Sequence, residues 1–139
     1  MTTDPDCIFC RIVAGEIPCF KLYEDGETVA FMDINPVNPG HALVTHKDHH
    51  RDLFDIPADD LGAVARTAQT VARALEKTLR PGGLNLLQCN GPAAKQSVMH
   101  VHMHVIPRHE GDGLTMNWEL VQGDMDAIGA LADRIRANL

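Results

Sequence analysis

Three histidines alternate with apolar residues in the segment HVHMHVIPR, where Val101 and Met103 separate His100, His102 and His104. Successive side chains of an extended strand point to opposite faces, so this spacing predicts three imidazoles on one face, about 6.6 Å apart. Imidazole titrates near neutral pH, and three such groups together indicate metal ligation, proton transfer or nucleophilic chemistry. The alternative is a half-buried strand whose wet face carries histidines by chance, since polar and apolar residues alternate in any such strand.

Two of the four cysteines form a CxxC pair, Cys7 and Cys10, close to the start of the chain. Such a pair is typical of a redox motif or of one half of a zinc site. The redox interpretation expects a preceding strand, which the first six residues do not provide. A zinc ion would need two further ligands, and histidines are the candidates because no second CxxC occurs in the sequence.

Length and charge limit the class of protein. The 139 residues fit a single domain, which we expect to span residues 1–139. A net charge of -7 disfavours a nucleic-acid surface, because binding to phosphate backbones needs a Lys/Arg footprint. No apolar run approaches the roughly 20 residues of a transmembrane helix. The N-terminus also lacks the basic and apolar regions of a signal peptide, so we expect a cytoplasmic protein that does not contact membranes.

The elements around the histidines predict an α+β domain. The longest helix is expected over about residues 58–80, where apolar residues recur at helical spacing, Asp59 and Asp60 favour its start and Pro81 ends it. The other expected elements are a short helix over 7–14, strands over 22–24, 28–33, 41–45, 84–89 and 99–106, and a last helix from about 124. Neighbouring strands around one long helix favour a mainly antiparallel five-stranded sheet, with that helix on the face opposite the histidines.

Neutral hydrogen-bond donors precede the histidine strand, at Asn90, Gln96 and Ser97. They suit phosphate oxygens, and a Walker-type GxxxxGKS/T loop is absent from the sequence. Asp33 follows a predicted strand and could accept hydrogen bonds from a ribose diol, with a turn-capping aspartate as the equal alternative. His102, the middle histidine, is the best candidate to attack phosphorus as a neutral imidazole whose other ring nitrogen donates to an acceptor.

The segments AFMDINPVNPGHALV and NGPAAKQSVMHVHMHVIPR closely resemble the histidine triad (HIT) superfamily, whose motif is three histidines alternating with apolar residues. The resemblance covers nearly the whole chain, from Cys7 through Trp118. It implies a HIT-like fold with a C-terminal helix. The opening CIFCRIVAGEIP is similar to the bacterial, zinc-containing members of the phosphoramidase-like (Hint) branch. The resemblance also implies a homodimer in which two sheets join into one, with the segment around Trp118 reaching toward the partner's site.

The resemblance assigns expected roles to the matching positions. His102 matches the nucleophile that takes a nucleoside monophosphoryl group, giving a covalent nucleotidyl-histidine that water then resolves. His104 and His41 match residues that contact the phosphate and support the nucleophile. The other expected contacts are Asn90, Gln96 and Ser97 at the phosphate, with Ser97 on the leaving-group side, Asp33 at the ribose, and Phe9, Ile12, Phe31 and Ile34 around the base.

The same resemblance implies a zinc site at Cys7, Cys10, His49 and His100. A closed Cys2His2 set has no open coordination position, so we expect structural zinc and no catalytic metal. His50 is the alternative to His49, because one residue of register decides which of the two faces the site. Two free thiols beside two surface histidines are the alternative to the whole cluster.

Two positions depart from the pattern of the family. Lys95 stands where a small residue, commonly Gly, precedes the Gln of the phosphate loop, so loop conformation and leaving-group preference are open at this position. His46 replaces a proline that often precedes the position of Lys47, and we expect only local consequences.

The expected function is a nucleotide hydrolase or transferase that cleaves a purine nucleoside monophosphate (AMP-type) from phosphoramidate-like substrates through His102. A dinucleoside polyphosphate (Ap4A-type) hydrolase is the alternative enzyme, because it shares the nucleophile and differs in the leaving-group pocket. A nucleotide-binding partner protein with incidental turnover is the alternative of another class, and the intact triad disfavours it.

Overall fold

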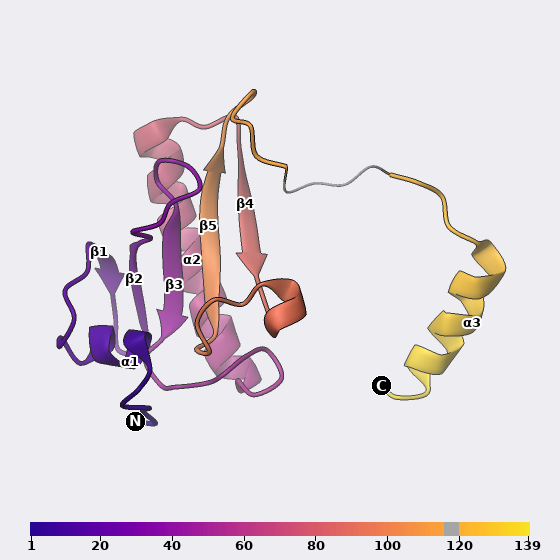
Figure 1. Ribbon diagram of the computed structural model, residues 1–139, viewed down its shortest axis with the longest axis horizontal. Helices are drawn as coiled ribbons and strands as arrows, with labels where there is room; N and C mark the ends of the chain where they lie inside the picture. The colour runs from indigo at the N-terminus through magenta and orange to yellow at the C-terminus, as the bar shows by residue number, and fades with distance from the viewer. Residues whose placement is uncertain (116–119) are drawn as a thin grey trace.

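The structure is a computed structural model that describes residues 1–115 and 120–139. Five strands in the described part of the chain form one antiparallel sheet in the order β1-β2-β3-β5-β4 (Figure 1). The strands are β1 (Lys21–Glu24), β2 (Thr28–Met32), β3 (Ala42–His46), β4 (Gly83–Gln88) and β5 (His102–Arg108). The predicted α+β fold is confirmed, and β1 and β4 are the edge strands of the sheet.

Helices account for the rest of the regular structure in the described residues. They are α1 (Ile8–Val13), α2 (Ala58–Leu79), the short 3-10 turn η1 (Pro92–Ala94) and α3 (Met125–Arg136). Asp59 and Asp60 lie in the first turn of α2, where negative charge favours the helix dipole. Arg80 ends α2 in the left-handed conformation, with φ 47°.

Helix α2 covers one face of the sheet, as predicted. Its buried Val64 and Ala68 belong to the same core cluster as Val44 of β3 and Val105 of β5. A second cluster lies under α1 and contains Cys7, Phe9, Cys10, Val29, Phe31 and Leu43. Because side chains alternate along a strand, Val105 toward α2 implies that His102 and His104 face the α1 side.

Strand β5 begins at His102, three residues later than the sequence predicted. Its pairing with β3 starts at the partners Thr45 and His102. Before that point the backbone N–H of Val101 donates to the carbonyl of His50 at 2.7 Å, so the chain there is held by a loop of β3. The prediction of three imidazoles on one strand face is therefore wrong for His100, which precedes the strand.

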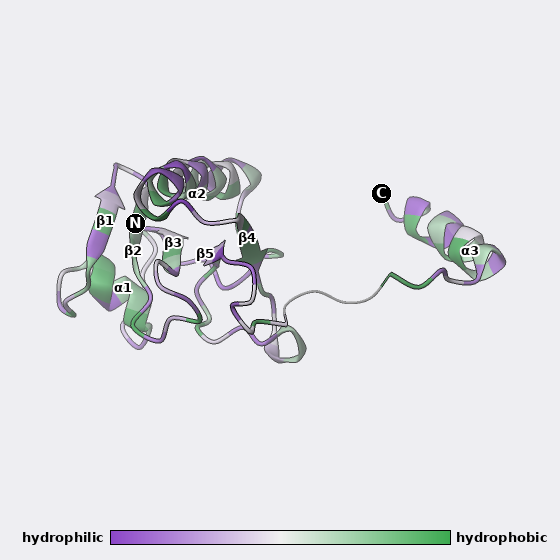
Figure 2. Cartoon of the chain, turned by 90° about the horizontal axis from the view of Figure 1, so that it is seen from above, coloured by the Kyte–Doolittle hydropathy of each residue, from purple (hydrophilic) through white to green (hydrophobic). Residues whose placement is uncertain are grey.

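Helix α3 lies apart from the sheet and from α2 in both views (Figures 1 and 2). Asp124 caps its start, because the Asp124 carboxylate accepts hydrogen bonds from the backbone N–H groups of Asp126 and Ala127. Trp118, which the family resemblance placed near a partner's site, lies outside the described residues. Across the described residues no helix combines the length and the apolar character that a membrane span requires.

Candidate functional site

His102 is buried at the start of β5, on the face of the sheet beneath α1. Its Nδ1 lies 2.7 Å from the carbonyl oxygen of His100, so Nδ1 carries the proton and donates. The neutral ring then presents a lone pair on Nε2. Burial is the main cause that lowers the pKa of His102, which keeps the ring neutral at pH 7. This is the state that a nucleophilic histidine needs.

His41 and His104 form a hydrogen-bonded pair beside the nucleophile candidate. The backbone N–H of Val37 donates to Nδ1 of His41 at 3.1 Å, so the proton of that neutral ring is on Nε2. Nε2 of His41 lies 2.9 Å from Nδ1 of His104, and His41 is therefore the donor. The proton of His104 is then on its own Nε2. A backbone amide thus fixes two tautomers in series and leaves His104 with an N–H for a ligand.

The electrostatics of the three rings favour an uncharged site. The ring centroids of His102 and His104 are 4.9 Å apart. Burial, followed by the charges of His102 and His41, lowers the pKa of His104 to about 4. Burial also lowers the pKa of His41, although Asp33 opposes this, with its Oδ2 3.5 Å from the Nε2 of His41. A phosphate would meet neutral N–H donors here, and the nucleophile would keep its lone pair at neutral pH.

A hollow of about 250 Å³ opens next to these rings, between α1 and the loop after β2. The ring of Phe9 forms one wall and meets His102 edge-on, with ring centroids 5.1 Å apart. Leu43 also lines it and was missed, although it follows His41 by two residues and strand alternation puts both on one face. The expected residues that line the hollow are Phe9, Ile12, Phe31, Asp33, Ile34 and Ser97.

The amide side chains of the predicted phosphate loop form hydrogen bonds with other parts of the protein. The Nε2 group of the buried Gln96 donates to the carbonyls of Arg51 at 2.7 Å and Val98 at 3.0 Å. The Oδ1 of Asn90 accepts from the backbone N–H of Leu53 at 2.7 Å. The structure therefore ties Asn90 and Gln96 to neighbouring loops, whereas the third expected donor, Ser97, is exposed at the hollow.

Lys95 occupies a backbone position that suits glycine. Its φ is 63°, in the left-handed region, directly after η1. A residue with a Cβ pays roughly 1 kcal/mol for this conformation, which explains why a small residue is expected there. The lysine side chain is exposed, so the departure from the family pattern is accommodated without burying a charge.

Cys7, Cys10, His49 and His100 bring four ligand atoms to within 4.8 Å of one another. The Sγ of Cys7 is 3.4 Å from Nδ1 of His100, and the Sγ of Cys10 is 3.3 Å from Nδ1 of His49. Tetrahedral zinc with ordinary bond lengths would separate sulfur and nitrogen ligands by roughly 3.6 Å. The four residues could therefore hold a metal ion with little rearrangement.

The other ring nitrogen of His100 is already used, as in most metal-bound histidines. Its Nε2 lies 2.9 Å from the carbonyl oxygen of His46 and donates to it, so the lone pair of Nδ1 faces the two thiols. Burial is the main cause that lowers the pKa of His100 to about 4, which leaves the ring neutral. His50 turns away, with its Nε2 3.0 Å from Oδ2 of Asp60, so the structure brings His49 to the cluster and not His50.

Residues 14–111 match the family described as HIT domain. This chain belongs to the HIT family. The HIT protein is 42% identical over 139 residues to adenosine 5'-monophosphoramidase HNT1 of Saccharomyces cerevisiae, a match that covers 99% of this chain and 85% of the yeast protein. It is 40% identical to adenylylsulfatase HINT3 of Arabidopsis thaliana, over 81% of this chain and 57% of the plant protein. These relatives are named as enzymes, in agreement with the expected HIT-type hydrolase.

Solved structures show the same fold as the HIT protein. A HIT family protein from Bacillus anthracis is 37% identical, with a TM-score of 0.90 over 99% of both chains. A Zn-bound histidine triad family protein from Mycobacterium smegmatis is also 37% identical, with a TM-score of 0.76 over 95% of this chain and 97% of that one.

Proposed function

We propose that this HIT protein cleaves an AMP-type group from phosphoramidate-like substrates, as a nucleotide hydrolase or transferase. The observation that carries the proposal is the bond from Nδ1 of His102 to the carbonyl of His100, which leaves Nε2 as a neutral nucleophile. The yeast relative named as an adenosine 5'-monophosphoramidase supports the substrate class.

In the first step, Nε2 of His102 attacks the phosphorus of the nucleotide. A bond from Nε2 to phosphorus forms, and the bond from phosphorus to the leaving amine breaks. The amine departs with the electron pair and takes a proton, which we assign to the hydroxyl of Ser97 at the hollow. Water then attacks phosphorus and returns one proton to the oxygen of Ser97, the bond to His102 breaks, the ring becomes neutral again, and the second proton of the water stays on the product phosphate.

The remaining residues bind and orient the substrate. The Nε2–H of His104 donates to a phosphate oxygen, and His41 holds His104 in the tautomer that allows this. Asp33 accepts hydrogen bonds from the ribose. The base would lie against the apolar walls of the hollow, formed by Phe9, Ile12, Phe31 and Ile34.

We propose that the cluster of Cys7, Cys10, His49 and His100 holds zinc, as in the zinc-containing bacterial members of the Hint branch. Two thiolates and two imidazoles are soft and borderline ligands that suit this metal. All four positions are taken by protein, so zinc would stabilise the fold by joining α1 to the loops before β5 and after β3. The reaction itself proceeds on the chain's own histidines.

We propose further that residues 1–139 form one HIT domain with α3 as its extension, and that the protein is a homodimer whose two sheets join. The edge strand β4 supports the dimer, because an unpaired edge with the exposed Leu86 is available for a second sheet.

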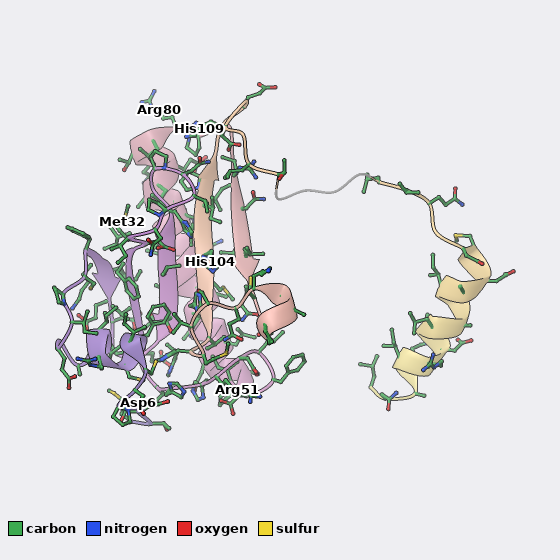
Figure 3. All side chains as sticks on the ribbon, in the orientation of Figure 1. Asp6, Met32, Arg51, Arg80, His104 and His109 are labelled. Carbon is green, nitrogen blue, oxygen red and sulfur yellow. The ribbon has the colours of Figure 1, made fainter. Side chains whose placement is uncertain are left out.

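The test is a comparison of kcat/KM for an adenosine phosphoramidate and for diadenosine polyphosphates, with mass spectrometry for a nucleotidylated His102. We expect the phosphoramidate to be preferred and His102→Ala to lower kcat by at least about 10⁴-fold while nucleotide binding remains. His109→Ala is the matched control, since His109 follows the end of β5, away from His104 (Figure 3).

Three results would contradict the proposal. Faster turnover of the polyphosphates would favour the alternative hydrolase. Wild-type rates in His102→Ala would remove the nucleophile from the mechanism. Nucleotide binding by wild-type protein without turnover of either substrate would favour the partner-protein class.

A further inference from the structure

The loop that joins β4 to β5, residues 89–101, contains one Lys, Arg, Asp or Glu side chain, that of Lys95. Lys95 and Ser97 are exposed on either side of the buried Gln96. Ser97 lines the hollow, and the Cα atoms of residues 95 and 97 are at most about 7 Å apart. Because lysine carries its ammonium on a flexible four-carbon chain, the charge of Lys95 can reach the space beside Ser97.

The backbone of Lys95 is held in a conformation that glycine would adopt at lower cost. Its φ is 63°, and its N–H donates to the carbonyl of Pro92 at 3.0 Å. The next residue closes the loop, because the backbone N–H of Gln96 donates to the carbonyl of Gly91 at 3.1 Å and the Oε1 of Gln96 accepts from the N–H of Gly91 at 2.8 Å. Strained positions of this kind cluster at ligand-binding sites. The lysine therefore calls for a function that glycine would not supply.

The ammonium of Lys95 is available to a ligand. None of the ion pairs within residues 1–115 and 120–139 includes Lys95. Arg51 also meets the phosphate loop, but through its carbonyl, which accepts from the amide of Gln96 at 2.7 Å. Its guanidinium is already paired, with Nε 3.0 Å from Oδ2 of Asp52. Of these two cations beside the loop, Lys95 is therefore the one that can pair with a substrate.

Charge is unevenly distributed around the hollow. Burial lowers the pKa of His102 and His104, so these rings are neutral at pH 7 and meet the phosphate without a net charge. Asp33 also lines the hollow, where we assign its carboxylate to the ribose. Lys95 adds positive charge beside Ser97, where we assign the departure of the amine. An ammonium at that place attracts a leaving group with negative charge and repels one with positive charge.

We propose that Lys95 selects phosphoramidates whose leaving amine carries a carboxylate, that is, AMP joined through nitrogen to an amino acid. This inference rests on the proposed function and names the leaving group of the same site. The carboxylate of such a substrate is two bonds from the departing nitrogen, so it lies close to Ser97 when the nitrogen does. Lys95 forms an ion pair with this carboxylate and takes no part in breaking the bond. It is thus a residue that determines specificity.

The measurement is the ratio of kcat/KM for two adducts of AMP, one with glycine and one with glycinamide, which differ in the charge of the leaving group. Lys95→Gln should lower this acid-to-amide ratio about 5-fold, the upper range for an exposed ion pair. Comparing the ratio between proteins removes the intrinsic difference between the two amines. The wild-type ratio should also fall as ionic strength rises from about 0.05 M to about 0.5 M, because salt screens an exposed pair.

Three further variants separate charge from backbone strain. Lys95→Arg keeps the charge and should keep the ratio. Lys95→Gly should lose the ratio without lowering Tm, because glycine adopts a positive φ at no steric cost. Lys77→Gln is the matched control, since it removes the same exposed charge from α2, on the other face of the sheet, and it should leave the ratio unchanged.

An equal loss for both adducts in Lys95→Gln would overturn the proposal, because it would place the charge at the phosphate of AMP. A larger loss for diadenosine tetraphosphate than for the glycine adduct would overturn it in favour of a polyphosphate. If the wild type turned over neither adduct, the proposed reaction would fail, and dissociation constants would then decide the role of Lys95. Tighter binding of the glycine adduct that Lys95→Gln abolishes would support the ion pair, and equal binding of both adducts would overturn it.

Discussion

The proposed metal cluster and the proposed reaction site are adjacent groups that contain histidines, and they differ in which ring nitrogen a carbonyl group holds. In the cluster, the carbonyl of His46 binds Nε2 of His100 and leaves Nδ1 facing the thiols. In the reaction site, the carbonyl of His100 binds Nδ1 of His102 and leaves Nε2 without a partner in the described chain. The residue type is the same in both, so the backbone carbonyl decides which ring nitrogen of each imidazole keeps its lone pair.

Their neighbours differ as well. Around His49 and His100 the nearest groups are thiols, which bind metal as thiolates. Around His102 and His104 the nearest groups are other imidazoles, the ring of Phe9 and, beside His41, the carboxylate of Asp33. Thiols are therefore what distinguishes the cluster of Cys7, Cys10, His49 and His100 from the site at β5.

The largest expected effect comes from removing the hydrogen bond that His41 donates to His104 in the proposed reaction site. His41→Leu should lower kcat by about 10³-fold, or about 4 kcal/mol, with KM less affected, because His104 loses the donor that fixes its tautomer. His41→Gln keeps an N–H donor and should recover part of the rate. Val37→Ala keeps the backbone N–H and serves as the control. A rate for His41→Leu equal to wild type would show that the pair is not part of the reaction.

A smaller effect is expected from the metal cluster. Cys10→Ser should abolish metal binding and lower Tm by roughly 10 °C, or about 3 kcal/mol in the free energy of unfolding, because α1 loses its link to the loops of the sheet. Cys89→Ser, outside the cluster, should change neither. Metal analysis and melting curves check this, and a metal-free wild type of equal stability would contradict the structural role.

The smallest effect is the pH dependence of stability. The pKa of His104 is lowered to about 4 in the folded protein, against about 6.5 in the unfolded chain, so unfolding takes up a proton between these values. This contribution is complete above about pH 6.5 and is lost as pH falls toward 4, amounting to about 2 kcal/mol for a partly exposed ring. His104→Gln should flatten the slope of the unfolding free energy in urea titrations. If the slope of the unfolding free energy against pH did not change, the conclusion that His104 is neutral in the folded protein would be contradicted.

Much of this arrangement could be predicted from the sequence because it follows from periodicity. The spacing of apolar residues gave α2, and alternation gave the face of β5 that carries His102 and His104. The start of β5 could not be predicted, because it depends on where β3 stops pairing and where the loop carbonyl of His50 takes the N–H of Val101. Pairing between distant segments has no local signal.

In the site, too, some features could be predicted from the sequence, and others depend on contacts between distant segments. Ligand types and the hollow's apolar walls could be predicted from the motif, whereas the tautomers could not, since they depend on the N–H of Val37 and the carbonyl of His100. Likewise, Gln96 and Asn90 have the donors that a phosphate needs, but in the fold the amide of Gln96 donates to the carbonyl of Arg51 and the amide of Asn90 donates to the side chain of Gln88. Nearly all residue types carry the same backbone N–H and C=O groups, so the sequence does not indicate which of them will contact the site.

His100 serves the metal cluster through its side chain and the nucleophile through its carbonyl. A substitution removes the first function and leaves the second, because every residue has a carbonyl group. If the cluster holds a metal, as we propose, the side chains at positions 7, 10, 49 and 100 depend on one another. The carbonyl at position 100 would hold Nδ1 of His102 whichever side chain stands there.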